Sequence, residues 1–185
     1  TLNRLEQALS IESSLKDYDR LQAIAQHVLV RMEREYEIYS PTKDELTWND
    51  RISLLRMHIL ESCEQQLGIS SNPKEPVRER TYRVEYVLKT QVDTLESEAT
   101  AETETATGDR ANKYSLIEKS IKRLLNFDAI YDGYVAENPT PERFLDTLTR
   151  LEREVFDIDK PPAKGYRHAR IKIGEPINLK DFFTE

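Results

Sequence analysis

Histidine, cysteine and glycine are the residues through which this sequence could bind a metal, a nucleotide or a reacting group. His27, His58 and His168 lie far apart, and no two stand four residues apart, the spacing at which a helix presents two imidazoles to one metal ion. Cys63 is the one cysteine, and its nearest histidine is five positions away, about 140° round a helix. The five glycines are isolated, so they form neither a phosphate-binding loop nor a dinucleotide fingerprint. The sequence therefore predicts no catalytic residue, no cofactor and no metal site.

Charged side chains give no better candidate for a site. The carboxylates Glu33 and Glu37, and Glu152 beside Glu154, have the spacing of exposed helix faces. We interpret the basic cluster 119–123 in the same way, as the solvated face of a helix. With 34 acidic and 27 basic residues the net charge is -7, so the averaged field repels phosphate backbones. A nucleic-acid partner is not expected.

The same composition also indicates the cellular compartment of the chain. A single cysteine forms no disulfide within the chain, which favours a reducing compartment. No stretch approaches the roughly 20 apolar residues of a membrane span. We expect a cytoplasmic chain. Because it begins at Thr1 without a leader, we also expect it to be a piece of a longer protein.

Hydrophobic periodicity predicts a mainly α fold of five or six helices, because apolar residues recur three or four apart along most of residues 1–160. Thr42 and Glu45 have capping-box spacing ahead of one helix, and Gly68 would end it. Thr140 followed by Pro141 predicts the start of the last helix. Such helices are expected to pack as an antiparallel bundle or in layers.

Two segments leave alternatives open. Residues 82–88 alternate like a strand but also repeat like a helix, and we predict a helix on the basis of length and charge content. Residues 97–111 are rich in Glu, Thr and Ala with little to bury, which predicts a flexible acidic loop within the helical domain 1–160.

An extended C-terminal tail, 161–185, is predicted after the Pro161-Pro162 pair. Apolar and basic residues alternate over 167–173, the pattern of a half-buried strand. One strand has no partner in a helical chain, so its backbone groups are expected to pair outside the chain. The residues predicted to form this interaction strand and its end are Ala169, Ile171, Ile173, Gly174 and Pro176.

The run Arg170-Ile171-Lys172-Ile173-Gly174-Glu175-Pro176-Ile177-Asn178-Leu179 resembles the closing strand of the glycerol-3-phosphate and lysophosphatidate acyltransferase family, which ends in an apolar strand, Gly-Glu-Pro and an apolar pair. Residues 131–156 resemble the helical extension that precedes this strand in some bacterial members. The resemblance implies that the full protein transfers an acyl group from a thioester donor to a lysolipid or glycerol phosphate. It also implies peripheral contact of the parent protein with the cytoplasmic face of the membrane.

The resemblance does not extend to the family's catalytic centre, in which an Asp follows a His by five positions. Five positions after the three histidines stand Met32, Cys63 and Ile173, and no Phe-Pro-Glu-Gly stretch occurs. We therefore expect a non-catalytic helical accessory domain, whose partner is the acyltransferase core of the same polypeptide. The alternative is a self-contained interaction or dimerisation module that uses its C-terminal strand to bind a second copy. A helical enzyme with an unfamiliar site is a third interpretation.

Overall fold

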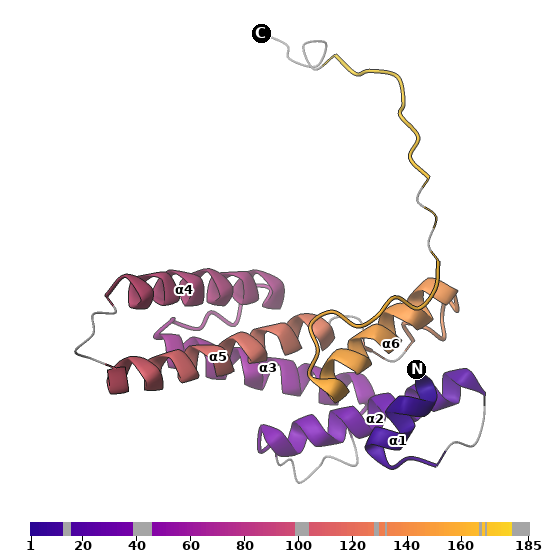
Figure 1. Ribbon diagram of the computed structural model, residues 1–185, viewed down its shortest axis with the longest axis horizontal. Helices are drawn as coiled ribbons and strands as arrows, with labels where there is room; N and C mark the ends of the chain where they lie inside the picture. The colour runs from indigo at the N-terminus through magenta and orange to yellow at the C-terminus, as the bar shows by residue number, and fades with distance from the viewer. Residues whose placement is uncertain are drawn as a thin grey trace.

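The described residues form six helices and a C-terminal segment that extends away from them (Figure 1). The computed structural model describes residues 1–12, 16–38, 46–98, 104–127, 130–131, 133–166, 168 and 170–178, with the backbone alone for 104–107. The helices are α1 (Leu2–Leu9), α2 (Asp17–Glu35), α3 (Trp48–Leu67), α4 (Val77–Glu98), α5 (Glu104–Phe127) and α6 (Pro141–Phe156). Because the described part contains no strand, the prediction of a mainly helical fold is confirmed.

Helix α3 begins later than the predicted capping box at Thr42 and Glu45, both of which lie outside the described residues. The cap is instead Thr47, whose hydroxyl accepts a hydrogen bond from the Asp50 backbone N–H at 3.2 Å. Asp50 returns the bond by accepting from the Thr47 backbone N–H, also at 3.2 Å. Gly68 ends the helix at φ 70°, the left-handed conformation predicted for it.

The predicted helix at 82–88 is confirmed, since α4 runs without interruption from Val77 to Glu98. The predicted loop at 97–111 is wrong in extent, because α5 already begins at Glu104. Glu and Ala have high helix propensity, so residues 104–111 belong to α5 although their sequence offers little to bury. Residues 99–103 lie outside the described part of the chain. The last helix begins as predicted, with the Thr140 hydroxyl accepting from the Arg143 backbone N–H at 3.3 Å.

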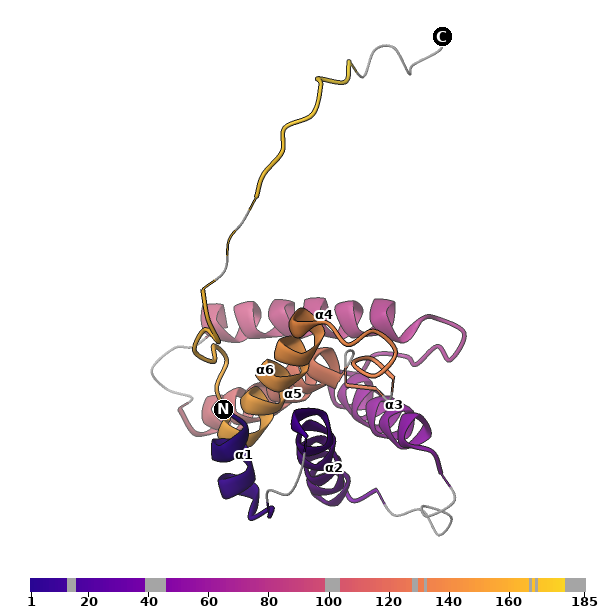
Figure 2. The ribbon, with the colours of Figure 1, turned by 90° about the vertical axis from the view of Figure 1, so that its right-hand side faces the viewer.

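The helices pack as two three-helix units that share one core. Helices α1, α2 and α6 form one unit, and α3, α4 and α5 form the other, with α2–α3 and α5–α6 contacts joining them (Figures 1 and 2). The buried apolar side chains of all six helices make one connected cluster, which includes Leu5, Ile24, Leu55, Val84, Leu124 and Leu151. The described part of the chain thus has the expected number of helices, packed as two units around a common core rather than as one simple bundle.

Buried ion pairs connect helices that follow one another in sequence. Glu6 of α1 pairs with Arg20 of α2 at 2.6 Å, and Glu33 of α2 pairs with Arg51 of α3 at 2.7 Å. The prediction that Glu33 lies on an exposed face is wrong, because its side chain is 3% exposed. A third pair, Glu64 of α3 with Arg80 of α4, is buried on both sides.

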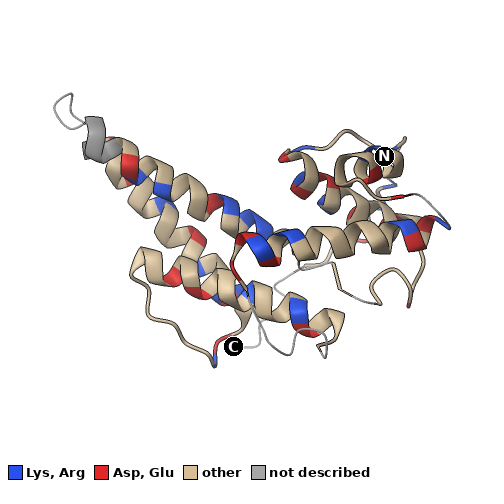
Figure 3. Ribbon diagram, turned by 90° about the horizontal axis from the view of Figure 1, so that it is seen from below, with Lys and Arg blue, Asp and Glu red and all other residues tan. Residues whose placement is uncertain are grey.

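Acidic and basic residues are interspersed along the helices in the view of Figure 3. None of the helices in the described part is both long and apolar enough to cross a bilayer. Large apolar side chains that are exposed include Leu54, Tyr82, Tyr86, Leu116 and Tyr131 on the body, and Tyr166, Ile171, Ile173 and Ile177 after it. The most exposed of them thus follow the last helix.

Candidate functional site

The described residues of the segment predicted to be an interaction strand, 168 and 170–173, extend away from the helices as an irregular chain. We call residues 165–178 the free tail. The exposed fractions are 86% for Ile171 and 94% for Ile173, and Gly174 and Pro176 are exposed as well. Ala169, the remaining predicted residue, lies outside the described part. The four described residues therefore reach solvent, as an interaction segment requires.

The predicted strand at 167–173 is not supported by the structure. Residues 168 and 170–173 are described there, and they form no strand. The physical reason is that a strand is completed by ladder hydrogen bonds to a neighbour, and the described part of the chain offers no second strand. The alternating pattern of Ile171 and Ile173 thus remains a property of the sequence that this chain by itself does not convert into a sheet.

Residues 157–164, which we call the anchored segment, hold the base of the free tail on the body. Lys164 forms an ion pair with Glu152 of α6, and the two side chains are 8% and 1% exposed. The prediction that Glu152 lies on an exposed face is therefore wrong. Since a buried carboxylate needs a cation beside it, Lys164 is held against α6 and the free tail leaves from a defined place.

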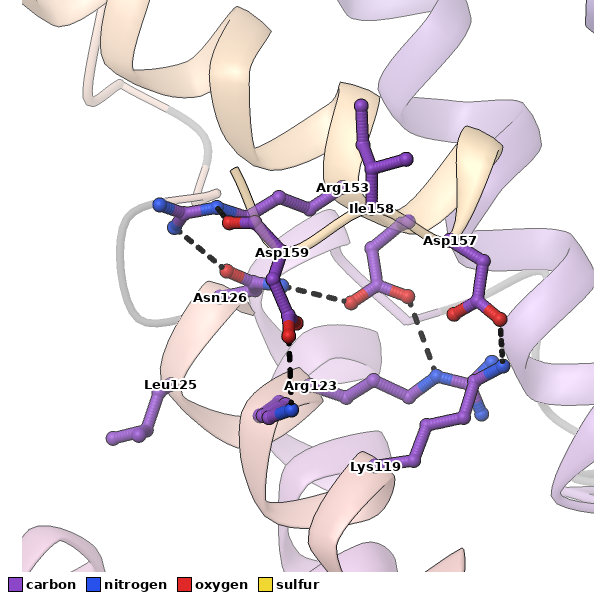
Figure 4. A pocket seen from close by; sticks show the side chains of 10 residues that line it. Lys119, Arg123, Leu125, Asn126, Arg153, Asp157, Ile158 and Asp159 are labelled. Atoms are coloured by element: carbon purple, nitrogen blue, oxygen red, sulfur yellow. Dashed lines mark hydrogen bonds and ion pairs between the residues drawn. The ribbon is translucent and has the colours of Figure 1, made fainter. Parts of the chain in front are cut away.

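A polar pocket of about 240 Å³ lies between α5 and the start of the anchored segment (Figure 4). Lys119 donates to Asp157 at 2.9 Å, and Lys122 donates to Asp159 at 3.3 Å. The Arg153 side chain also donates to the backbone oxygen of Asp159, at 3.2 Å. These contacts tie the end of α6 and the residues after it to α5.

Arg123 joins three helices at the base of this pocket. Its guanidinium donates to both carboxylate oxygens of Glu35 at 2.6 and 3.0 Å, and to the Tyr36 hydroxyl at 3.0 Å. It also donates to Glu154 of α6 at 3.3 Å. Because its side chain is 8% exposed, the prediction that the basic cluster 119–123 is a solvated face is wrong at this residue.

The electrostatics of the pocket are those of paired charges. Burial acts to lower the pKa of Arg123, but the hydrogen bonds to Glu35 and Tyr36 outweigh it and raise the pKa. The hydrogen bond that Lys119 donates lowers the pKa of Asp157, and the hydrogen bond that Lys122 donates to Glu118 raises the pKa of Lys122. Each shift favours the charged form, so these groups stay ionised near neutral pH. Such an arrangement fixes structure rather than transferring protons.

The other candidate residues form no reactive group in the described part of the chain. Burial raises the pKa of the Cys63 thiol to about 11, so the thiolate is scarce at neutral pH. His27 contacts the Ala23 carbonyl oxygen at 2.9 Å, and His58 and His168 are exposed on α3 and the free tail. No cluster of three metal-binding side chains occurs among the described residues.

Sequence reasoning missed the buried charges Glu33, Glu64, Arg80, Arg123 and Glu152. Their types and spacing match those of surface residues, and each partner lies on another helix or in the anchored segment. One signal was available: Glu64 directly follows Cys63, and Arg80 lies four positions before Val84, so both stand beside the apolar stripes of their helices. The partner could not be identified from that pattern, because it depends on how the helices pack.

Comparisons with protein-family models, with curated proteins and with solved structures find no match for this chain.

Proposed function

We propose that the chain is a non-catalytic helical module that binds a partner through its free tail. The observation that carries the proposal is the exposure of three isoleucines in one short segment: 86% for Ile171, 94% for Ile173 and 73% for Ile177. Burying an isoleucine side chain contributes about 1.5–3 kcal/mol. A partner that covers these side chains would gain this hydrophobic free energy on binding, because the helices of this chain do not bury them.

The pattern of the free tail suits docking by strand addition. In an extended chain alternate side chains point to the same side. Ile171 and Ile173 would therefore face the binding surface of the partner, while Arg170 and Lys172 would face away from it. An open sheet edge supplies the backbone hydrogen bonds that this segment lacks in the described structure. Pro176 would then end the strand, because its nitrogen has no hydrogen to donate.

The partner sheet that we propose first is the α/β core of a glycerolipid acyltransferase. The support is the resemblance of residues 170–179 to the closing strand of that family, together with the helical stretch 131–156 before it. In that case the parent protein transfers the acyl group, and this chain is its accessory domain at the cytoplasmic membrane face. A second copy of this chain is the alternative partner, favoured by an apolar groove described below.

Two measurements test the acyltransferase assignment. The purified chain, incubated with an acyl thioester and a lysolipid, is expected to give no turnover, and turnover would contradict the non-catalytic reading. The coding sequence upstream of Thr1 is expected to encode a His followed by an Asp five positions later. A coding sequence without that pair would exclude the acyltransferase core as partner while leaving tail-mediated docking open.

Docking itself is tested by the variant Ile171→Asp/Ile173→Asp. If that core is encoded upstream, it is produced separately and titrated with the full chain and with this variant, and self-association is measured by light scattering. We expect at least one of the two associations, and its loss in the variant. The matched control is Leu116→Asp, on the exposed face of α5. Association of neither kind, or association that the tail variant leaves unchanged, would refute the proposal.

A further inference from the structure

We propose that the free tail of one copy docks in the groove between α4 and α5 of a second copy. This inference rests on the alternative form of the proposed function, in which the partner of the tail is a second copy of the chain, and it names the receiving surface on that copy. The groove has a volume of about 460 Å³, and its apolar floor is formed by Leu88, Val92 and Leu95 of α4 with Tyr114 of α5. Val92, Leu95 and Tyr114 are only partly buried, so the groove offers apolar surface to an incoming chain.

Charge favours the tail as the occupant. The groove is lined by the carboxylates Glu85, Glu96 and Glu118 and by the ammonium of Lys89. Glu118 already pairs with Lys122 of α5 at 3.2 Å, so the acidic character of the rim comes from Glu85 and Glu96. The free tail, 165–178, contains three lysines and arginines and a histidine against a single acidic residue, Glu175. An acidic rim around an apolar floor thus meets a basic chain with apolar side chains, which is the complementarity that selects partners.

The spacing of the apolar residues agrees with this fit. In an extended chain Ile171 and Ile173 are about 6.6–6.8 Å apart on the same side. Leu88 and Val92 are one helical turn apart, about 6 Å along α4. Two isoleucines of the tail can therefore pack beside successive turns of the groove. Arg170 and Lys172 point away from the floor, but their long side chains can bend toward the carboxylates at the rim.

The position of the tail favours a second copy over the groove of the same chain. Along the long axis of Figure 1 the tail leaves the body above α6, whereas the paired ends of α4 and α5 lie at the opposite end. The ion pair of Lys164 with Glu152 holds the base of the tail at α6. Exchange of tails between two copies would fill both grooves and give a closed two-fold dimer.

Cysteine cross-linking tests this arrangement in the full chain. The native Cys63 is 1% exposed, so introduced cysteines react against a low background. One preparation carries Ser115→Cys, in the groove, and the other carries Ile173→Cys; they are mixed under mild oxidation. The matched control replaces Ser115→Cys by Ser53→Cys, an exposed serine of α3. We expect the heterodimeric disulfide to form at least about tenfold faster with the groove cysteine, since it would be held beside its partner at raised effective concentration.

Charge reversal at the rim gives an independent readout. The double variant Glu85→Lys/Glu96→Lys is expected to weaken dimerisation about fivefold or more in light scattering, because attraction between the rim and the basic tail becomes repulsion at two positions. Glu79→Lys, on the exposed surface of α4 outside the groove, serves as the control and is expected to change the dimerisation constant less than twofold.

Three outcomes would overturn the inference. Equal cross-linking of the two serine positions, with a tail-dependent dimer still present, would refute the groove but not tail-mediated docking. A disulfide formed only within single chains of a Ser115→Cys/Ile173→Cys variant would refute the second copy. A monomer at all concentrations that still binds the separately produced acyltransferase core through its tail would refute the dimer while supporting the proposed function.

Discussion

Replacing Arg80 by methionine is expected to destabilise the fold more than any single change at an exposed charge. Arg80 and Glu64 are each 1% exposed, and the guanidinium donates to both carboxylate oxygens at 2.9 and 2.7 Å. It also donates to the Ser71 hydroxyl at 2.8 Å. The substitution keeps an apolar stem of similar length but leaves the Glu64 carboxylate buried without this partner.

The magnitude follows from the cost of an uncompensated buried charge. Removing one member of a buried ion pair costs about 3–5 kcal/mol. Arg83 still faces Glu64 at 3.5 Å after the substitution, so we expect the lower end, about 3 kcal/mol. Because folded domains have about 5–15 kcal/mol of stability in total, this loss is large but leaves a folded protein to measure.

Urea unfolding followed by circular dichroism measures the effect. With a denaturant slope of about 2 kcal/mol per molar, a loss of 3 kcal/mol lowers the midpoint by about 1.5 M. Arg110→Met, at an exposed arginine of α5, is the matched control and is expected to change stability by less than about 0.5 kcal/mol. The double variant Glu64→Leu/Arg80→Met should recover most of the loss, because apolar replacement of both partners is often near neutral. A midpoint shift for Arg80→Met no larger than that of the control would refute the reasoning.

Three further predictions concern the charged junction, pH and the thiol. Arg123→Met is expected to lower the free energy of unfolding by about 2–4 kcal/mol in the same assay, because it leaves Glu154 buried without its cation. Arg123→Lys should restore less than half of this loss, since an ammonium does not bridge both carboxylate oxygens of Glu35. The hydrogen bond from Arg80 lowers the pKa of Glu64 in the folded chain. The stabilisation by this ion pair is therefore complete above the pKa of an unfolded Glu, about 4.3, and is lost as pH falls through the lower folded pKa. The difference in unfolding free energy between the native chain and Arg80→Met should narrow below about pH 4, and a difference independent of pH would contradict this. Cys63 is expected to react with a thiol reagent at pH 8 at least about 100-fold more slowly in the native chain than in urea, because its burial raises the pKa and blocks access; equal rates would contradict that burial.

Much of the helical architecture could be predicted from residue patterns, because the signals involved are local. The stripe of apolar residues, the Gly68 stop and the Thr140-Pro141 start depend on neighbours within one or two turns, and the structure confirms them. The first residue of α3 was misplaced because Thr47 and Asp50 provide the same capping chemistry as the predicted pair. The beginning of α5, residues 104–111, was assigned to a loop because low hydrophobicity was weighed above helix propensity.

The sequence by itself determined most of the helical segments, and it showed that residues 170–178 carry apolar and basic side chains without a helical pattern. Only the tertiary structure decided which charges are buried, because Glu33, Glu64 and Arg123 meet partners on other helices. It also decided that Lys164 is held against α6 while the isoleucines beyond it stay exposed. The reason is that helix formation depends on contacts between near neighbours, whereas the partner of a buried charge or of an extended chain is set by segments that only folding or binding brings together.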